Sequence, residues 1–268
     1  MSQNADCFEG SLMIVAIDGP AGSGKSSVAK RVARALGFAY LDTGAMYRAV
    51  AWRAVEEGLD LSDPLCPASV ERIRQIAQHE RVTFGFTAGE PLPSQVFIND
   101  KDVTQQIRTP VCDRAVSPVS ADAGVREALT QQQRDFGREH NTVMEGRDIG
   151  TVVFPAAECK VFLTASPQER ALRRARQNAE REGRQAATPQ EVEAIHADIL
   201  RRDAYDSSRE VAPLAAAADS WELDTTGMSI EQVVEAIVGR VEAVGAGAGA
   251  LPAAATTAAA QPPEVTRP

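Results

Sequence analysis

The sequence predicts an α/β protein built on a five-stranded parallel sheet with helices on both faces. Two observations support this prediction: short apolar runs of strand length alternate with longer helical patterns, and glycine or proline residues often separate them. With 268 residues, 44% of them hydrophobic, the chain is long enough to bury a full core. Ligands of such sheets bind beyond the carboxyl ends of the strands, so polar residues that follow strands are the first site candidates.

The expected elements follow from the apolar patterns. Core strands are predicted at residues 13–17, 38–42, 142–146, 159–164 and 221–224. Helices are predicted at residues 28–36, 45–58, 64–78, 121–136 and 229–244, with a charged helical pair over 168–209 that breaks near residues 183–189. Residues 81–86 and 95–99 alternate like strands around a stretch with glycine and proline, which predicts an antiparallel hairpin in an inserted subdomain.

A phosphate-binding motif follows the first strand. Residues 19–26 fit GxxxxGK(S/T) and precede a helical pattern, so this is the P-loop arrangement rather than a mere glycine-rich turn. Backbone N–H groups and the positive helix end would point at phosphate oxygens. Lys25 would bridge the β- and γ-phosphates, and Ser26 would reach Mg²⁺. The predicted ATP-binding residues are Gly19, Pro20, Ala21, Gly22, Ser23, Gly24, Lys25, Ser26 and Ser27.

Charge and composition exclude several classes of protein. A net charge of −9 argues against binding a nucleic-acid polymer through a general basic surface, so an anionic ligand needs local arginines. No apolar stretch approaches the ~20 residues that span a bilayer, and residues 1–6 lack the features of a signal peptide. The four cysteines form no CxxC pair, and the three histidines lack metal-ligand spacing. We therefore expect a cytoplasmic protein with no membrane partner and no zinc site.

Arginines are concentrated between residues 168 and 209. A solvated helix face is the alternative for each of them, but their clustering in a protein with a P-loop favours a lid that closes over phosphates. The arginines are Arg170, Arg173, Arg174, Arg176, Arg181, Arg184, Arg201, Arg202 and Arg209.

Three separated segments, residues 41–48, 145–155 and 202–209, resemble bacterial cytidylate kinases of the P-loop nucleoside monophosphate kinase superfamily. The similarity also runs through residues 98–108 and 125–129, and it covers roughly residues 12 to 243. The resemblance implies a three-layer P-loop kinase core, an inserted monophosphate-binding subdomain that contains the hairpin, and a helical lid.

The resemblance also implies a division of the chain. The core comprises residues 12–43, 119–168 and 206–244, the monophosphate-binding subdomain residues 44–118, and the lid residues 169–205. Residues 1–11 and 245–268 are predicted to be disordered tails, because they lack a face that could be buried.

The implied activity is transfer of the γ-phosphoryl group of ATP, with Mg²⁺, to CMP or dCMP in pyrimidine nucleotide metabolism, by a monomer. Cytosine presents an amino donor beside ring acceptors, which suits a carboxylate next to cationic or hydroxyl donors. By resemblance, Asp148 supplies the carboxylate, with Arg126, Arg209 and Thr43 as donors. UMP would set a carbonyl against Asp148, at a penalty of ~1–3 kcal/mol. From the residues alone, Asp148 could instead be a helix cap or turn carboxylate, and Thr43 reads as an N-cap.

The remaining site residues also come from the resemblance. Arg48 and Arg147 would clamp the acceptor phosphate, since guanidinium groups bind phosphate in a bidentate manner. Arg202 and Asp206 would hold the sugar, with an i,i+4 helix salt bridge as the alternative. Tyr47 completes the predicted CMP-binding set.

Phosphoryl transfer needs cations and in-line positioning rather than a general base. We therefore predict Lys25, Arg173, Arg174 and Arg176 as catalytic residues that neutralise transition-state charge. Another small-molecule kinase, such as one acting on shikimate, gives no reason for the residues around Asp148. A GTPase would need an NKxD motif, which is absent, and the intact Gly24, Lys25 and Ser26 argue against a purely structural relative.

Overall fold

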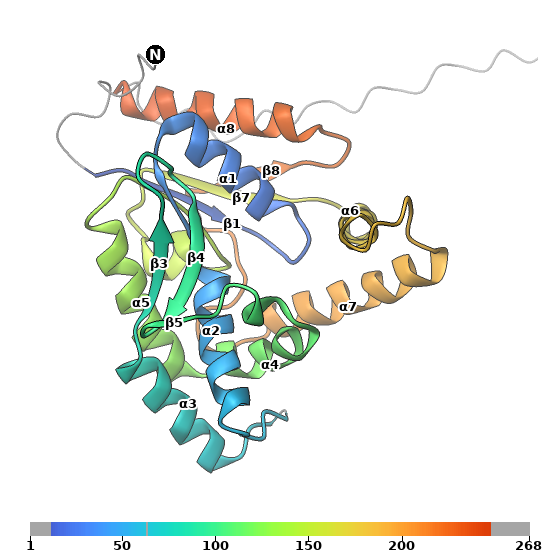
Figure 1. Ribbon diagram of the computed structural model, residues 1–268. Coiled ribbons are helices and arrows are strands. Elements are labelled where there is room, and N and C mark those ends of the chain that lie inside the picture. Colours follow the sequence, from blue (N-terminus) through green and yellow to red (C-terminus); the bar gives the residue numbers. More distant parts are fainter. Residues whose placement is uncertain (1–11, 63, 248–268) are drawn as a thin grey trace, which may run out of the picture.

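The computed structural model describes residues 12–62 and 64–247. It contains the predicted parallel sheet, with strands in the order β2 (Ala39–Asp42), β6 (Thr142–Glu145), β1 (Ile14–Asp18), β7 (Cys159–Thr164) and β8 (Trp221–Asp224) (Figure 1). All four neighbouring pairs are parallel. Each strand lies within a residue or so of its predicted position, so the expected fold class is confirmed.

Helices cover both faces of this sheet (Figure 1). On one face, α1 (Lys25–Leu36) and α8 (Ile230–Gly245) pack against Val15 and Ile17, while Ala16 belongs to the core on the opposite face. Successive side chains of a strand point to opposite faces, so this division follows from the strand period of two. Because both faces are covered, every residue of β1 is buried.

The opposite face carries four helices: α2 (Thr43–Glu56), α3 (Pro67–His79), α4 (Pro110–Ala121) and α5 (Ala123–Gly137). Met46, Ile73 and Leu129 from these helices share one core with Leu41 of β2. Helix α4 was not predicted, although Thr109 caps it and Pro110 occupies its first turn. Its interior Pro118 is the reason, because a proline normally ends a helical pattern.

The predicted hairpin is also confirmed. It consists of β3 (Val82–Phe86) and β4 (Pro93–Ile98), which pair antiparallel, and a short β5 (Lys101–Asp102) extends it. A 3₁₀ turn, η2 (Gln106–Arg108), leads on to α4. Val82, Val96 and Ile98 lie in the same core as Leu41, so the insert packs on the sheet's own core.

Two arginine-rich helices, α6 (Pro167–Arg181) and α7 (Pro189–Ser207), extend to one side of the sheet (Figure 1). The break between them falls where it was predicted, and Gly183 there has a φ of 69°. Helix α7 starts with a capping box in which Thr188 and Glu191 bond each other's backbone. Apart from residues 245–247, the two tails that were predicted to be disordered lie outside the described residues.

Candidate functional site

The site lies at the carboxyl ends of β1, β2 and β6. Asp18, Asp42 and Glu145 end these three strands. They are followed by the P-loop, by Thr43 at the start of α2, and by the segment from Gly146 to Asp148. Parallel strands place all these residues at one edge of the sheet. The fold therefore brings together three sequence segments that are far apart in the chain.

The P-loop folds around the Lys25 side chain. Lys25 Nζ donates to the Pro20 carbonyl at 2.7 Å and to Ser23 Oγ at 3.4 Å. Burial, with a contribution from the Arg147 charge, lowers the pKa of Lys25. Gly19 must be glycine, because its φ is +148° and a Cβ there would lie 2.1 Å from the Leu163 carbonyl oxygen. Gly24 precedes α1 and provides no side-chain cap, so the first N–H groups of the helix are open to an anion.

Beside the P-loop, Ser26 and Tyr40 bond the same buried carboxylate. Ser26 Oγ donates to Glu145 Oε2 at 2.9 Å, and the Tyr40 hydroxyl donates to Glu145 Oε1. Burial, reinforced by the charge of Asp42, raises the pKa of Glu145. A hydroxyl and one carboxylate fit Mg²⁺, which usually takes one or two protein oxygens and completes its shell with phosphates and water. Residues 12–62 and 64–247 contain no group of three His, Cys, Asp or Glu placed to hold an ion by themselves.

Asp18 ties the end of β1 to the segment after Asp148. Its two carboxylate oxygens accept from the backbone N–H groups of Ile149 at 2.9 Å and Gly150 at 2.7 Å, at the start of η3 (Ile149–Val153), a π-helical turn. Burial is the main reason that the pKa of Asp18 is raised to about 6, despite these two hydrogen bonds. Asp18 thus positions the backbone that carries the predicted base-reading carboxylate.

Arg126 and Asp148 form a buried ion pair. Their closest atoms are 2.5 Å apart, and the two side chains are only 4% and 6% exposed. Arg126 also donates to the Ser120 carbonyl at 2.9 Å and lies over the Tyr47 ring, 5.2 Å from its centroid. Asp148 precedes η3 without capping it, so its alternative interpretation as a helix cap is wrong. In the described structure the buried Arg126 Nε and Tyr47 Oη have no hydrogen-bond partner, which indicates a pocket that a polar ligand completes.

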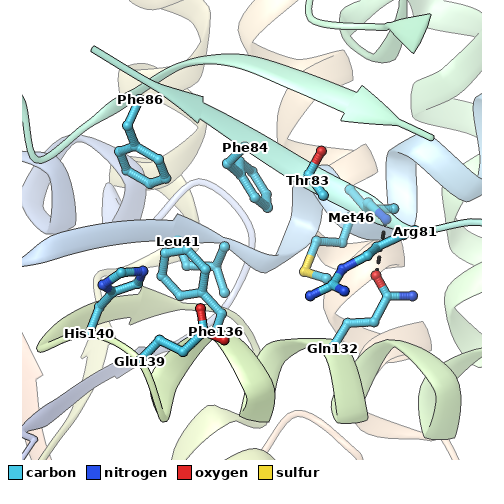
Figure 2. A pocket seen from close by; sticks show the side chains of 11 residues that line it. Leu41, Met46, Arg81, Thr83, Phe84, Phe86, Gln132, Phe136, Glu139 and His140 are labelled. Atoms are coloured by element: carbon cyan, nitrogen blue, oxygen red, sulfur yellow. Dashed lines mark hydrogen bonds between the residues drawn. The ribbon is translucent and has the colours of Figure 1, made fainter. Parts of the chain in front are cut away.

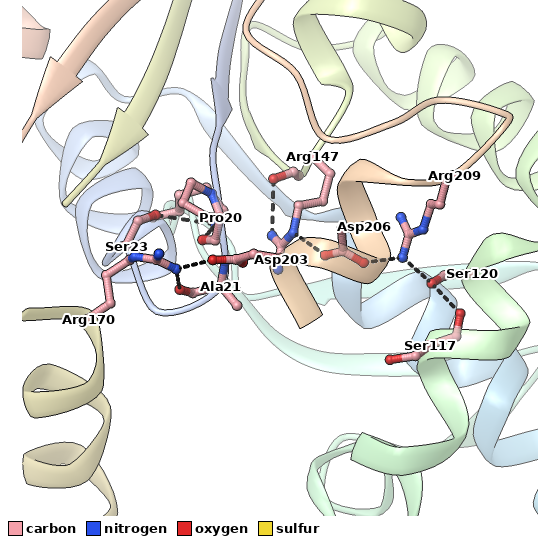
Figure 3. Close-up of polar contacts among 12 residues, drawn as sticks. Pro20, Ala21, Ser23, Ser117, Ser120, Arg147, Arg170, Asp203, Asp206 and Arg209 are labelled. Atoms are coloured by element: carbon pink, nitrogen blue, oxygen red, sulfur yellow. Dashed lines mark hydrogen bonds and ion pairs between the residues drawn. The ribbon is translucent and has the colours of Figure 1, made fainter. Parts of the chain in front are cut away.

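A second polar chain runs beside this pair (Figure 3). Arg147 Nε donates to Asp206 Oδ2 at 3.0 Å, and Arg209 bonds both Asp206 and Ser120 Oγ, the latter at 3.0 Å. Asp206 therefore pairs with Arg147 and Arg209, and the alternative of an i,i+4 helix salt bridge with Arg202 is wrong. Burial alone would raise the pKa of Asp206, but the two guanidinium groups outweigh it and hold that pKa below its usual value.

Two further arginines, Arg48 and Arg202, join Arg147, and the charges of Arg48 and Arg147 both act on Arg202. Burial lowers the pKa of Arg202, and the charges of Arg147 and Arg48 lower it further. Arg48 is balanced by an ion pair with Asp113 on α4. The repulsion that Arg147 and Arg48 exert on the half-buried Arg202 is relieved by an anion, so this cluster suits a phosphate group.

The predicted capping role of Thr43 is wrong. Asp42 caps α2 instead, since its carboxylate accepts from the Ala45 N–H at 3.0 Å. Thr43 is the first residue of the helix, and its hydroxyl donates to the Glu145 carbonyl at 2.7 Å. An aspartate at N-cap and a threonine at N1 give nearly the same sequence signal, so the pattern alone did not separate them.

The three arginines of α6 that were predicted to be catalytic differ in their surroundings. Arg173 is held by Glu169 at 2.9 Å and by the Thr225 hydroxyl and carbonyl at 2.9 and 2.7 Å. Arg174 is half-buried, and the charges of Asp113 and Arg48 act on its pKa, which burial lowers. Arg176 is exposed. Of the three, Arg174 is the one beside the Arg48 cluster, and their catalytic roles stay predictions.

Sequence reasoning missed several residues of the site. Asp18 and Glu145 could have been noticed because each is a carboxylate at the last position of a core strand. Arg170 was given the alternative of a solvated face, which is wrong because its side chain is 5% exposed and paired with Asp203. No pattern in the sequence separates Arg170 from its arginine neighbours.

A cavity of about 220 Å³ lies apart from these polar clusters, between β3 and α5 (Figure 2). Three phenylalanines, Phe84, Phe86 and Phe136, line it together with polar side chains. Its full lining is Leu41, Met46, Arg81, Val82, Thr83, Phe84, Phe86, Gln132, Phe136, Glu139 and His140.

Among the described residues, no helix combines the length and apolar character needed to cross a membrane.

Comparison with known proteins gives consistent matches. A family model described as cytidylate kinase matches residues 15–243. A cytidylate kinase of Solibacter usitatus is 44% identical over 226 residues, which cover 84% of this chain and 90% of the relative. One from Limosilactobacillus fermentum is 45% identical over 228 residues, 85% of this chain and 95% of the relative. A bifunctional pantoate ligase/cytidylate kinase of Trichormus variabilis is 47% identical over 225 residues, but this chain spans only 40% of its length.

Proposed function

The chain belongs to the cytidylate kinase family, and from that premise we propose that it transfers the γ-phosphoryl group of ATP to CMP or dCMP. The products are CDP or dCDP and ADP, which places the reaction in pyrimidine nucleotide metabolism. The expectations of a cytoplasmic location and a monomeric state stay predictions.

The observation that carries the proposal is the buried pair of Arg126 and Asp148. A carboxylate and a guanidinium held 2.5 Å apart present an acceptor and donors side by side, which matches the amino group and ring acceptors of cytosine. Asp18 and Ser120 hold the two partners through backbone contacts, so the pair is in place before a base binds. Preorganised groups of this kind favour one base over its isosteres.

The residues that would bind ATP, the phosphoryl donor, support the same proposal. Lys25 and the open N–H groups at the start of α1 would hold the ATP phosphates, and Ser26 with Glu145 would hold Mg²⁺ directly or through water. When bound, Mg²⁺ would neutralise charge on the phosphoryl oxygens. Arg48 and Arg147 would orient the acceptor phosphate, whose oxygen attacks without needing a general base. Arg202 and Asp206 would hold the sugar.

The proposal is tested by measuring ADP release in a coupled assay with CMP, dCMP, UMP and shikimate as acceptors. We expect CMP and dCMP to support turnover and UMP to support much less, because its carbonyl would face Asp148. Stimulation by shikimate alone, or by neither cytidine nucleotide, contradicts the proposal. Omitting Mg²⁺ and adding a chelator tests the metal, and undiminished turnover in that arm would exclude its assigned role.

A further inference from the structure

One end of α7 touches both halves of the site. Asp203 Oδ1 accepts from the Ala21 N–H of the P-loop at 3.1 Å. Three residues later, Asp206 bonds Arg147 and Arg209 of the acceptor side. Residues three apart lie on the same face of a helix, so a single turn of α7 bridges the P-loop and the acceptor pocket (Figure 3).

Arg170 of α6 completes the contact with the P-loop. Its Nη1 donates to the Ala21 carbonyl at 2.9 Å and to Asp203 Oδ2 at 2.5 Å, and its Nε donates to the Ala165 carbonyl at 3.0 Å. Both the N–H and the carbonyl of Ala21 are therefore bonded by side chains of the two lid helices. A pair of a buried arginine and a half-buried aspartate that also bonds backbone on both sides is geometrically specific.

Packing at the next P-loop residue gives independent support. A Cβ on Gly22 would lie 3.2 Å from Ile199 Cδ1 and 3.3 Å from the Arg170 Cβ. The lid helices thus rest directly on the loop, and Gly22 has a φ of +75° that suits glycine. Ile199 lies one turn before Asp203 on α7, so the contact with the loop extends along that helix.

We propose that Arg170 and Asp203 are positioning residues that hold the P-loop backbone at Ala21 and link its geometry, through one turn of α7, to occupancy of the acceptor pocket. When CMP fixes Asp206 and Arg202, the same turn fixes Asp203 and therefore Ala21. A ligand that holds this turn in place also favours the loop geometry that the other ligand needs, so by linkage each ligand strengthens binding of the other. This inference rests on the proposed function, because it assumes that CMP occupies the pocket around Asp206.

The test uses ADP and CMP, a pair that cannot react with each other. Titration calorimetry with Mg²⁺ present gives the Kd of ADP alone and at saturating CMP. For the full-length protein we expect CMP to tighten ADP binding about 5-fold or more, the usual lower range of such coupling. Asp203→Asn should reduce this tightening, the ratio of the two Kd values of ADP, to below about 2-fold. It should also weaken ADP binding, while the Kd of CMP measured alone changes little. Glu193→Gln, an exposed carboxylate on the same helix, is the matched control and should keep the full ratio.

A second variant protects the test against misfolding. Arg170→Lys keeps the charge opposite Asp203 but lacks the forked donors that reach Ala21 and Ala165 together, so its ratio should fall between those of the other two proteins. Circular dichroism and thermal unfolding establish which variants are folded. The inference is overturned if folded Asp203→Asn keeps the full ratio, or if Asp203→Asn does not fold and Arg170→Lys keeps it. If the unmodified protein binds ADP but not CMP, the proposed function fails instead.

Discussion

Two buried carboxylates of the site, Asp18 and Asp206, show how partners set the pKa. Burial raises the pKa of Asp18 to about 6, because its partners are two neutral backbone N–H groups. Burial also acts on Asp206, but Arg147 and Arg209 outweigh it and hold the pKa below its usual value. Full charges stabilise a buried carboxylate more than amide dipoles do. The two groups therefore affect stability in opposite directions as the pH changes.

The raised pKa of Asp18 predicts a pH-dependent effect on stability. Between about pH 4 and pH 6 the folded protein binds a proton at Asp18 that the unfolded chain has lost, so this residue's contribution to the free energy of unfolding falls as pH rises. Asp18→Asn removes the titration. Relative to the unmodified protein, its free energy of unfolding should rise by about 2–3 kcal/mol from pH 4 to pH 7. Urea denaturation at several pH values measures this, and a constant difference across the range would refute it.

Substitution of Asp148 is expected to change the selectivity for the base. Asp148→Asn keeps the side chain's size but replaces one acceptor oxygen by a donor and leaves Arg126 without its charge partner. We expect kcat/KM for CMP to fall about 10- to 100-fold and that for UMP to fall less, because only cytosine donates to the lost acceptor. Steady-state kinetics with both acceptors checks this. Asp135→Asn on the exposed side of α5 is the control, and equal losses with CMP and UMP would contradict the assigned role.

At the scale of elements, hydrophobic periodicity predicted most of the fold. The five core strands, the hairpin and the break between α6 and α7 all appear where the pattern placed them. Helix α4 was missed because Pro118 interrupts its pattern, yet its N-terminus is satisfied by Thr109 and Pro110. Local signals therefore fix an element well when propensity and periodicity agree, and poorly when one residue opposes them.

The candidate site was only partly predictable for a different reason. The motifs supplied the candidate residues, but the partners of these residues depend on tertiary packing. Helix α6 carries several arginines, and only the folded arrangement shows that Arg170 is buried against Asp203 while Arg176 is exposed. Residue type and spacing do not distinguish these two. The same holds for Asp206, which pairs with Arg147 from a distant segment and with Arg209 rather than with Arg202.

The capping box of α7 makes a prediction for that helix. Thr188→Ala removes the side chain that accepts from the Glu191 N–H and leaves an N-terminal donor unsatisfied. The first turn of α7 should lose about 1 kcal/mol of stability, seen as faster amide hydrogen exchange over residues 190–194. Ser229→Ala removes the equivalent capping residue of α8 and serves for comparison. Unchanged exchange in α7 of Thr188→Ala would show that the box contributes nothing there.

At the scale of the whole molecule, a chain with a net charge of −9 nevertheless concentrates cations at one place. Arg48, Arg147 and Arg202 come from α2, the loop after β6 and α7, and the charges of the first two act unfavourably on the third. The negative net charge of the whole chain therefore does not predict the positive charge of the site. The local field is set by which elements meet, as expected when binding depends on a focused potential rather than on total charge.

This arrangement predicts that the acceptor stabilises the entire protein. CMP at 100 times its Kd should raise the free energy of unfolding by about 2.7 kcal/mol and the Tm by roughly 5–10 °C. Thermal unfolding monitored by circular dichroism measures the shift. Cytidine, which lacks the phosphate, should give a smaller shift at equal concentration. Equal shifts from CMP and cytidine would show that the arginine cluster does not bind the phosphate.

The core that the insert shares with the sheet limits how this protein can be redesigned. Leu41, Met144 and Ala16 of the sheet are buried in the same cluster as Val96 and Ile98 of the hairpin. Deleting the hairpin, or grafting in one from a relative, would change the cover of that apolar face and would need compensating substitutions on it. The hairpin therefore cannot be exchanged independently of the sheet. Its sequence is expected to co-vary with that of the strands beneath it during evolution.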